Sequence, residues 1–135
     1  MRASGTFTVP EFTPAAVPVG DIETAVGVGV ATMRKEFQGE IAGRSTTLFT
    51  SAFDHAAGVG TYLAMESFAG RLHDVEGTFN FAHSATTLGA GREGEYFVIV
   101  PGSGTGGLVG ITGTGGIVID EDGTHRIHLD YELPS

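Results

Sequence analysis

The sequence predicts an all-β fold, an eight-stranded antiparallel barrel that residues 1–135 form as a single domain. Segments with the alternation of half-buried strands, or with short apolar runs, recur along the chain, whereas helical periodicity is weak. The 22 glycines are spread through these segments, as is common where barrel strands bend. A length of 135 residues is close to the usual size of one domain with one core.

The strands follow one another along the chain with turn residues between them. The first, Thr6–Val9, alternates between polar and apolar residues. The next four are Ala25–Phe37, Ile41–Phe53, Gly60–Phe68 and Thr78–Thr87, separated by turns at Gly39, Ala57-Gly58 and His73–Glu76. After a turn at Leu88–Gly94, the apolar run Tyr96–Val100 is typical of a strand covered on both faces. The last two, Leu108–Asp120 and Arg126–Leu133, follow turns at Pro101–Gly107 and Glu121–Gly123.

Two alternatives to this arrangement remain open from the pattern alone. Asp21–Arg34 has some helical character at its start, but Gly27 and Gly29 alternate with valines there, which favours a strand. A sandwich of two sheets competes with the barrel, because both use about this number of antiparallel strands. An eight-stranded barrel would enclose space for side chains or for one small ligand.

Composition and charge exclude several classes of function. The formal net charge of −9 repels phosphate groups, so we expect no nucleic-acid partner and no anionic membrane partner. No apolar run approaches the length of a membrane span, and Met1–Pro14 lacks the pattern of a signal peptide, so we expect a cytoplasmic protein. The absence of Cys excludes disulfides and thiolate chemistry.

Neither a cofactor nor a metal ion is expected. Gly102–Gly107 fits the G-x-G-x-x-G pattern, but a nucleotide site needs a helix next, and Leu108–Gly116 is a poor helix. The segment is better explained as a tight turn followed by a glycine-rich strand. The five His residues show no metal-binding spacing, and His125 and His128 fall on opposite faces of a strand.

The hairpin Tyr62–Thr87 contains the most informative pair of residues. A turn at His73–Glu76 places Glu66 opposite His83, with Phe68 opposite Phe81. This face is the more aromatic one, and we assign it to the interior of the barrel. It comprises Tyr62, Ala64, Glu66, Phe68, Phe79, Phe81 and His83.

An interior Glu66 beside His83 has a chemical and a structural interpretation. Burial raises the pKa of a Glu and lowers that of a His, while their attraction does the opposite, so the pair could share a proton near neutral pH. Such a pair suits general acid–base catalysis. The structural interpretation is a hydrogen-bonded pair that only fixes the strand register, and a slip by one residue would place Glu66 outside.

The opposite face of the same hairpin is unusually apolar for a barrel exterior. It carries Leu63, Met65 and Ala69 among small polar residues. We expect either a subunit interface in a homo-oligomer or a packed terminal segment such as Pro10–Pro18.

Several segments in order resemble a bacterial domain-of-unknown-function family, number 3224. They are Phe37–Gly43, Glu66–Gly70, Gly77–His83, Val100–Ile111 and His125–Leu133. The likeness runs from Ala3 to Leu133, and the P-G-S-G-T-G-x-L-x-G-I stretch is its most specific part. Glu66 and His83 stand where the family commonly has Glu and His. The turn His73–Glu76 departs from the family's Gly-Gly-Arg-like turn, so a shared substrate is not implied.

The fold of that family is similar to the allene oxide cyclase barrel, which plant dirigent proteins also use. The resemblance implies an eight-stranded antiparallel barrel, lipocalin-like in shape, with a central cavity. It also implies assembly as a dimer or trimer. The catalytic residues of allene oxide cyclases have no matching motif here, so none is carried over.

The leading functional hypothesis is a cofactor-independent isomerase or cyclase for a hydrophobic, lipid-like or polyketide-like small molecule. Glu66 and His83 would be its catalytic residues. The predicted substrate contacts are Tyr62, Phe68, Phe79, Phe81, Tyr96 and Tyr131. A barrel that only carries an apolar ligand is the alternative, and a structural barrel filled by its own side chains is the third. Glu66 separates the first two, because a carrier has little reason to bury an ionisable group.

Overall fold

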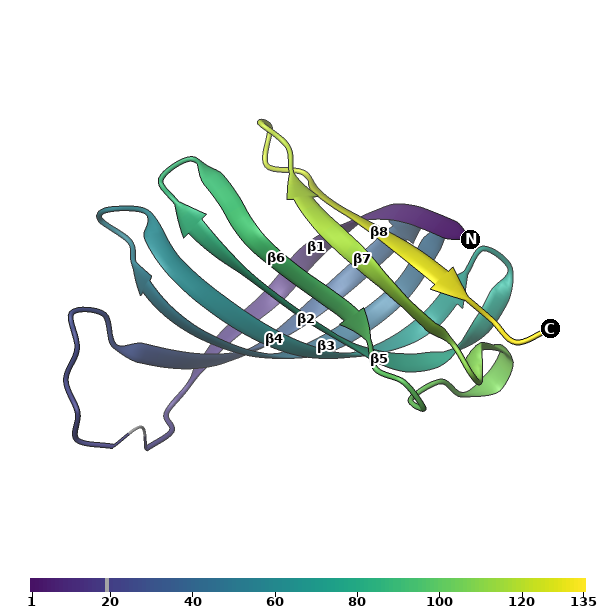
Figure 1. The fold of residues 1–135 in the computed structure, drawn as a ribbon, viewed down its shortest axis with the longest axis horizontal. Helices are drawn as coiled ribbons and strands as arrows, with labels where there is room; N and C mark the ends of the chain where they lie inside the picture. The colour runs from purple at the N-terminus through teal and green to yellow at the C-terminus, as the bar shows by residue number, and fades with distance from the viewer. Residues whose placement is uncertain (19) are drawn as a thin grey trace.

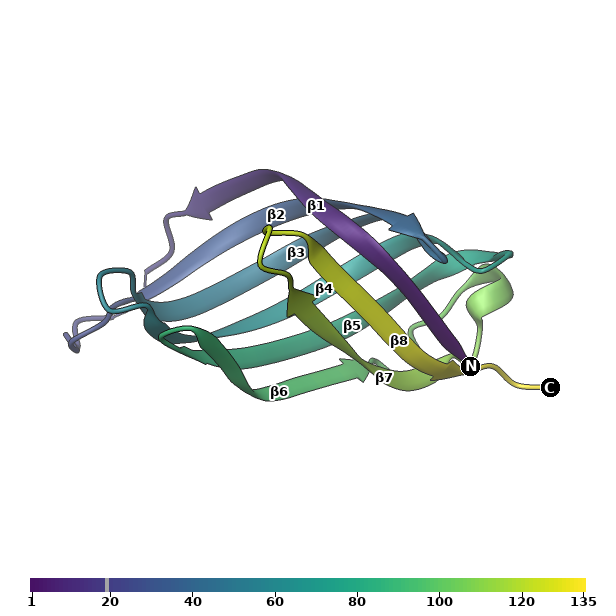
Figure 2. The same cartoon turned by 90° about the horizontal axis from the view of Figure 1, so that it is seen from above.

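Eight antiparallel strands close into a barrel in the order of the sequence (Figure 1, Figure 2). The computed structural model describes residues 1–18 and 20–135. The strands are β1 (Arg2–Ala15), β2 (Val28–Gly39), β3 (Ile41–Asp54), β4 (Val59–Leu72), β5 (Val75–Leu88), β6 (Gly91–Ile99), β7 (Thr112–Ile119) and β8 (His125–Glu132). Because β1 pairs with both β2 and β8, the sheet has no free edge, and the predicted barrel is confirmed over the sandwich.

β1 is much longer than the alternating Thr6–Val9 segment indicated. Its pairing with β2 shifts between Thr8 and Glu11, around Pro10. Proline has no N–H to donate to the ladder, so the strand bulges there and then continues to Ala15. Glu11–Ala15 therefore pairs with β2, and the expectation that Pro10–Pro18 covers the outer face of the β4–β5 hairpin is wrong for this part of the segment.

The segment from Leu108 to Ile111 is not the start of a strand. Gly106–Leu108 forms a short 3-10 helix, η1, and β7 begins only at Thr112. Gly106 and Gly110 adopt positive φ values of 62° and 80°, which turn the chain back over the barrel end. Leu108 and Ile111 are both 0% exposed and close that end. Among the described residues, no helix has the length and apolar character needed to cross a membrane.

The turn between β4 and β5 is tighter than predicted. β4 ends at Leu72, which pairs with Val75, so only two residues form the turn. His73 takes a φ of 52°, a left-handed conformation of the kind that tight hairpins require, and its Nε2 lies 3.0 Å from the Arg2 carbonyl oxygen. Glu66 consequently pairs with Phe81, not with His83. The observed partner of Glu66 lies two residues away from the predicted one. Because a shift by two residues preserves the alternation of faces along a strand, Glu66 and His83 both keep the predicted inward orientation.

The predicted turn at Leu88–Gly94 also differs, because β6 already begins at Gly91. Gly94 has a φ of 62°, and the β5–β6 register shifts between Ser84 and Thr86 on the opposite strand. The glycine marks a bulge inside a strand, a role that glycine commonly takes in sheets. The bulge changes the phase of β6, with Phe97 and Ile99 facing inward beyond it.

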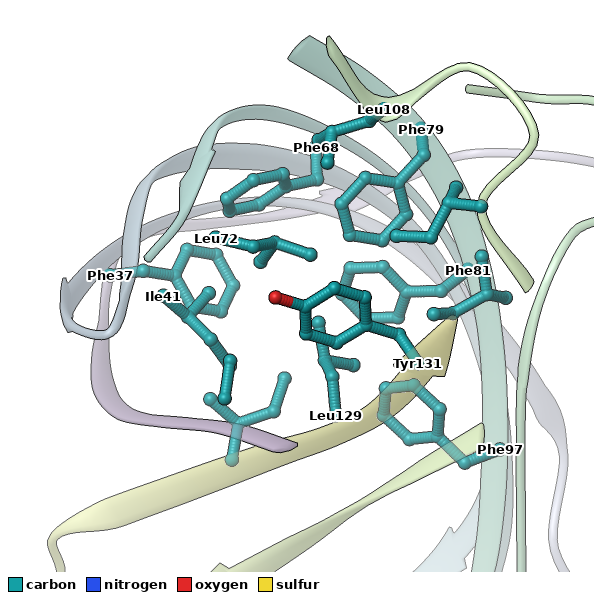
Figure 3. Close-up of a cluster of buried hydrophobic side chains, with 14 of the residues drawn as sticks. Phe37, Ile41, Phe68, Leu72, Phe79, Phe81, Phe97, Leu108, Leu129 and Tyr131 are labelled. Atoms are coloured by element: carbon teal, nitrogen blue, oxygen red, sulfur yellow. The ribbon is translucent and has the colours of Figure 1, made fainter. Parts of the chain in front are cut away.

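The barrel is packed with side chains at one end, which we call the filled end. It lies on the side of the two chain termini in Figure 1 and is drawn in Figure 3. Aromatic and aliphatic residues from most of the strands and from η1 meet there: Phe37, Ile41, Phe68, Leu72, Phe79, Phe81, Leu108, Leu129 and Tyr131. The inward residues toward the other end, such as Phe49 and Tyr62, are only partly buried, and this open half contains the site described next.

Candidate functional site

A cavity of about 170 Å³ lies inside the open half of the barrel. Apolar side chains such as Phe7, Met33 and Ile117 form much of its wall. Its polar lining consists of Lys35, Tyr62, His83, Arg92 and His125. A second hollow of about 360 Å³ shares Phe49 and Tyr62 with it, and Phe12, Phe53 and His55 also line this second hollow. Larger hollows of about 530 to 610 Å³ are lined by none of the fully buried polar residues, and one of them adjoins the cavity, because it shares Arg92 and Ile117 with it.

Glu66 is the centre of a buried polar cluster behind the cavity. Its side chain is 0% exposed and accepts hydrogen bonds from three donors on three other strands. Lys35 Nζ lies 2.6 Å and His83 Nε2 2.5 Å from Oε2, while Ser45 Oγ lies 2.8 Å from Oε1. These residues meet because each occupies an inward position of its strand, and β2, β3, β4 and β5 are neighbours in the sheet.

The carboxyl group of Glu66 is held in its ionised form. Burial alone would raise its pKa, but the hydrogen bond from His83 and the charge of Lys35 lower the pKa to about 2. The expectation that Glu66 and His83 share a proton near neutral pH is therefore not met. The physical reason is that the hydrogen bond from His83 and, after it, the charge of Lys35 outweigh burial, and the hairpin pattern did not include Lys35.

His83 has a defined orientation and a defined proton. A carboxylate only accepts hydrogen bonds, so the ring donates its Nε2 proton to Glu66. Its other nitrogen, Nδ1, lies 2.8 Å from the hydroxyl of Tyr62. The ring also stacks against Phe81 and Phe97, with centroids 5.9 and 5.5 Å away. These contacts fix the imidazole in one rotamer.

Arg92 determines the direction of the Tyr62 hydrogen bond. Its Nη2 lies 3.0 Å from the Tyr62 hydroxyl oxygen, and a guanidinium only donates. The phenol proton of Tyr62 is then available for donation to His83 Nδ1, and the hydrogen bond runs in this direction when the imidazole is neutral. Burial raises the pKa of Tyr62, and the nearby Arg92 opposes that rise. We call the resulting chain of hydrogen bonds, Glu66–His83–Tyr62, the relay.

Glu95 supports this end of the site across a weak seam of the barrel. β6 and β7 diverge (Figure 2), and Val98–Thr114 is the recorded pair between them in the described part of the chain. The Glu95 carboxylate bridges them, because Oε2 accepts from Arg92 at 3.0 Å and from the Ile117 backbone N–H at 3.1 Å. Arg92 is thus held in place for its contact with Tyr62.

The predicted site residues separate into three groups. Tyr62 and His83 line the cavity, and Glu66 lies directly behind His83. Phe68, Phe79 and Tyr131, each 2% exposed, belong to the filled end, while Phe81 packs against His83 from that end. Tyr96 is 57% exposed and points outward, because its neighbour Phe97 takes the inward position. The run Tyr96–Val100 is thus buried on one face only, and of the predicted substrate contacts only Tyr62 reaches the cavity.

Sequence reasoning missed Lys35, Ser45 and Arg92. Lys35 is the chain's single lysine and lies two residues before Phe37, in the same phase of its strand, so alternation places it inside. Ser45 is in phase with Ile41 in the same way. No such signal existed for Arg92, because it falls in a segment that the glycines marked as a turn. Among the described residues, no group of three or more His, Asp or Glu side chains could hold a metal ion.

Comparisons with known proteins show one family and a solved structure from it. The family model described as "Protein of unknown function (DUF3224)" matches residues 3–131. A crystal structure of a protein of unknown function from the same family, from Shewanella oneidensis MR-1, superposes with a TM-score of 0.87 at 27% sequence identity. The match covers 100% of this chain and 98% of that one. Among curated proteins, no match to the chain was found.

Proposed function

Because this chain belongs to the DUF3224 family, whose description assigns no activity, we propose its function from the site itself. The protein is a cofactor-independent isomerase or cyclase that acts on a small, largely apolar molecule in the open half of the barrel. It combines acid–base catalysis with binding of the substrate in a reactive conformation.

The relay is the observation that carries this proposal. A buried, ionised carboxylate is connected through an imidazole to a tyrosine hydroxyl in the cavity wall. Polar contacts that only fix the strand register do not require a chain of hydrogen bonds that ends at the cavity. Such a chain is the arrangement that general acid–base catalysis requires, because each group holds the next in a defined protonation state.

The proton transfer can be written with the groups present. The Tyr62 oxygen takes a proton from a substrate C–H bond, whose electron pair stays on the substrate, while the phenol proton passes to His83 Nδ1. The imidazolium that forms is stabilised by the Glu66 carboxylate. Tyr62 then returns a proton to another atom of the substrate, and His83 returns its proton to Tyr62. The net result is an isomer, with no oxidant or reductant consumed.

Glu66 has a positioning role in this scheme. It is fully buried and does not line the cavity, and its low pKa leaves it ionised through the cycle. Tyr62 and His83 are the catalytic residues, since both line the cavity. The apolar walls favour a lipid-like or polyketide-like chain, and the adjoining hollow of about 360 Å³ offers room for the part of the substrate that does not react.

A carrier of apolar ligands is the second candidate. The continuity of apolar wall between the two hollows, through Phe49 and Tyr62, favours it. A carrier would bind the molecule and release it unchanged, and loss of the Tyr62 hydroxyl would then change affinity only. The two candidates therefore differ in one measurable property, the chemical change of the bound molecule.

The test uses an organic-solvent extract of bacterial cells, incubated with the protein in D2O and analysed by liquid chromatography and mass spectrometry. We expect at least one compound to gain carbon-bound deuterium or a new isomer. Tyr62→Phe should lower this turnover by about 10²-fold or more, the usual contribution of a positioned acid–base group. Tyr96→Phe makes the same chemical change on the outer surface and should leave it unaltered.

Native mass spectrometry of the purified protein completes this experiment. A co-purified apolar compound that stays unchanged in D2O, and for which Tyr62→Phe alters the affinity only, would establish the carrier and refute the enzyme. A compound whose conversion depends on Tyr62 would establish the enzyme.

A further inference from the structure

We propose that the substrate carries a neutral carbonyl group and that Lys35 donates a hydrogen bond to its oxygen inside the cavity. The inference rests on the proposed function, since it identifies the chemical class of molecule on which the relay acts. It follows from the donors, the charges and an unpartnered hydroxyl around the cavity.

The cavity wall offers hydrogen-bond donors, while the two carboxylates behind it already accept hydrogen bonds from the protein. Glu66 accepts from Lys35, Ser45 and His83. Glu95 accepts from Arg92 and from a backbone N–H. By contrast, the Lys35 ammonium has three N–H donors, and its recorded hydrogen bond among the described residues is the one to Glu66. A ligand that fits this wall therefore presents an acceptor.

Lys35 is placed to bind a ligand although it is almost fully buried. Its side chain is 6% exposed, it lines the cavity, and its Nζ lies 4.8 Å from the centre of the Phe7 ring. The ion pair with Glu66 and the contact with Phe7 hold the ammonium in one position. A donor held in this way loses little conformational freedom when a ligand binds.

The charges around the cavity favour a neutral acceptor over a carboxylate. Lys35 is paired with Glu66, and Arg92 is paired with Glu95. With both pairs complete, an added carboxylate would bring an uncompensated charge into a buried site, which is unfavourable. A ketone or enone oxygen accepts a hydrogen bond and adds no net charge.

Thr47 supplies an independent observation at the same place. Its Oγ1 is buried and has no hydrogen-bond partner in the described part of the chain. Thr47 is an inward residue of β3 that pairs with the cavity-lining Met33 on one side and with Glu66 on the other. Buried hydroxyl groups are nearly always hydrogen-bonded, so this one, which neighbours cavity-lining residues without itself lining the cavity, marks a place where a further polar partner is expected.

The potential in the cavity agrees with this placement. Burial lowers the pKa of His125, and the positive charges of Lys35 and Arg92 lower it further. His125 lines the same cavity as both cations, so a positive charge at His125 is disfavoured. The same field favours the partial negative charge of a carbonyl oxygen, and the negative charge that develops on it is balanced by the imidazolium that forms at His83, a balance that a bound carboxylate lacks.

The position of Lys35 also connects the carbonyl to the relay. Lys35 Nζ and His83 Nε2 contact the same oxygen of Glu66, at 2.6 and 2.5 Å. When Tyr62 takes a proton from the carbon next to the carbonyl, the C–H electron pair moves into the new C=C bond and the carbonyl π electrons move onto oxygen. The enolate oxygen is then stabilised by the Lys35 ammonium. In a β,γ-unsaturated ketone this enolate is a dienolate. Return of a proton to the γ carbon uses the electrons of the Cβ=Cγ bond, the enolate C=C electrons form the new Cα=Cβ bond, and the oxygen electron pair re-forms the carbonyl.

The test compares three probes of similar size: acetophenone, ethylbenzene and benzoate. Wild-type protein should bind acetophenone about tenfold or more tightly than ethylbenzene, as expected for a hydrogen bond from a charged donor. The carbonyl stretch of bound 13C-labelled acetophenone should move to lower frequency. In Lys35→Met, both the preference and the shift should disappear, while ethylbenzene affinity is unchanged.

Two further variants keep the result interpretable. Lys35→Met combined with Glu66→Gln removes both charges and guards against misfolding caused by an unpaired carboxylate; it too should lack the preference. Tyr62→Phe should keep the preference and the spectral shift, and should lose deuterium exchange at the acetophenone methyl group. Failure of the proposed function is thus seen in turnover and failure of this inference in binding.

Two results would overturn the inference. One is equal affinity of the wild-type protein for acetophenone and ethylbenzene. The other is tighter binding of benzoate than of acetophenone, which would assign the site to carboxylates. Neither result affects the turnover measured with the cell extract, so the proposed function would stand or fall separately.

Discussion

At the scale of single residues, the ionised state of Glu66 depends on its three donors. The Lys35 ammonium and the His83 N–H both contact Oε2, and Ser45 contacts Oε1. Without them, a fully buried carboxyl group would be protonated at neutral pH. The cluster therefore explains how a carboxylate can remain at the centre of an aromatic barrel, and it predicts how stability responds to pH and to substitution.

The free energy of unfolding should fall as acid is added. The pKa of Glu66 is lowered from 4.5 to about 2 in the folded protein, so its contribution is complete above about pH 4.5 and is lost as the pH falls toward 2. The size of the loss is on the order of 3 kcal/mol. Urea unfolding at a series of pH values measures it, and Glu66→Gln should show a shallower slope in this window. An equally steep slope in the variant would assign the acid sensitivity to other groups.

Breaking the Lys35–Glu66 pair on one side should be more harmful than removing it. Glu66→Gln leaves the buried Lys35 ammonium without its counter-charge, which we expect to lower the free energy of unfolding by about 3–5 kcal/mol. Adding Lys35→Met should restore part of this loss, because both charges are then absent. Chemical unfolding of the two single variants and the double variant gives the coupling energy. Additive effects would show that the two groups do not depend on each other.

At the scale of elements, the loop that carries η1 closes the filled end by packing against β5. Leu108 and Ile111 enter the core from this loop, and the Thr105 N–H donates to the Thr78 carbonyl oxygen. Gly77 in β5 permits the approach, because a Cβ there would lie 2.1 Å from the Thr105 carbonyl oxygen. The glycine-rich segment is thus a structural plug, consistent with reading its G-x-G-x-x-G pattern as a turn.

Gly77→Ala should displace this loop and lower the free energy of unfolding by about 1–3 kcal/mol, the range for overpacking of a core. Gly91→Ala is the matched control, because a Cβ at Gly91 meets no atom within 4 Å. Thermal unfolding of both variants measures the difference. Equal melting temperatures for the two would show that the loop contributes little to closing the barrel.

The sequence predicted the number, type and order of the strands, because alternation and turn residues are local signals. It predicted the inward face of the β4–β5 hairpin for the same reason. The exact register of the β4–β5 hairpin was not predicted, since it depends on the φ of 52° at His73. A histidine at this position does not by itself indicate a left-handed conformation. The bulges at Pro10 and Gly94 shifted strand ends in the same way.

The site itself was predicted only along one hairpin. Glu66, His83 and Tyr62 lie on two adjacent strands, so pairing rules brought them together. Lys35 and Ser45 come from β2 and β3, and their contact with Glu66 appears only when the barrel closes. Tyr131 and Phe68 were expected beside the substrate because they occupy inward positions of their strands. An alternating pattern shows which residues face the interior, but it does not show which end of the barrel is filled with side chains.

At the scale of the whole molecule, the outer face over β3 to β6 stays apolar and uncovered. Leu48 and Met65 are paired neighbours on it and are 55% and 50% exposed. Leu63 and Tyr96 extend the face, at 59% and 57% exposed. Assembly of two or three copies of the chain through this face stays a prediction, as does the likeness to allene oxide cyclases.

Leu63→Arg should therefore shift the protein to the monomer, because a charge in an apolar interface is unfavourable. Sedimentation velocity of the wild type and the variant measures the change, with Thr8→Arg as a control, because Thr8 is an exposed residue of β1 that pairs with Glu36 outside this face. A wild-type protein that sediments as a monomer at high concentration would remove the case for an interface here.

The relay runs from the Glu66 carboxylate through His83 to the Tyr62 hydroxyl in the cavity wall, and the proposed proton transfer depends on it. The most direct measurement is 15N NMR of His83 at neutral pH in the ligand-free protein. We expect a neutral imidazole that carries its proton on Nε2 and accepts a hydrogen bond at Nδ1. A ring protonated on Nδ1 alone, or on both nitrogens, would contradict it, because His83 could then take no proton from Tyr62.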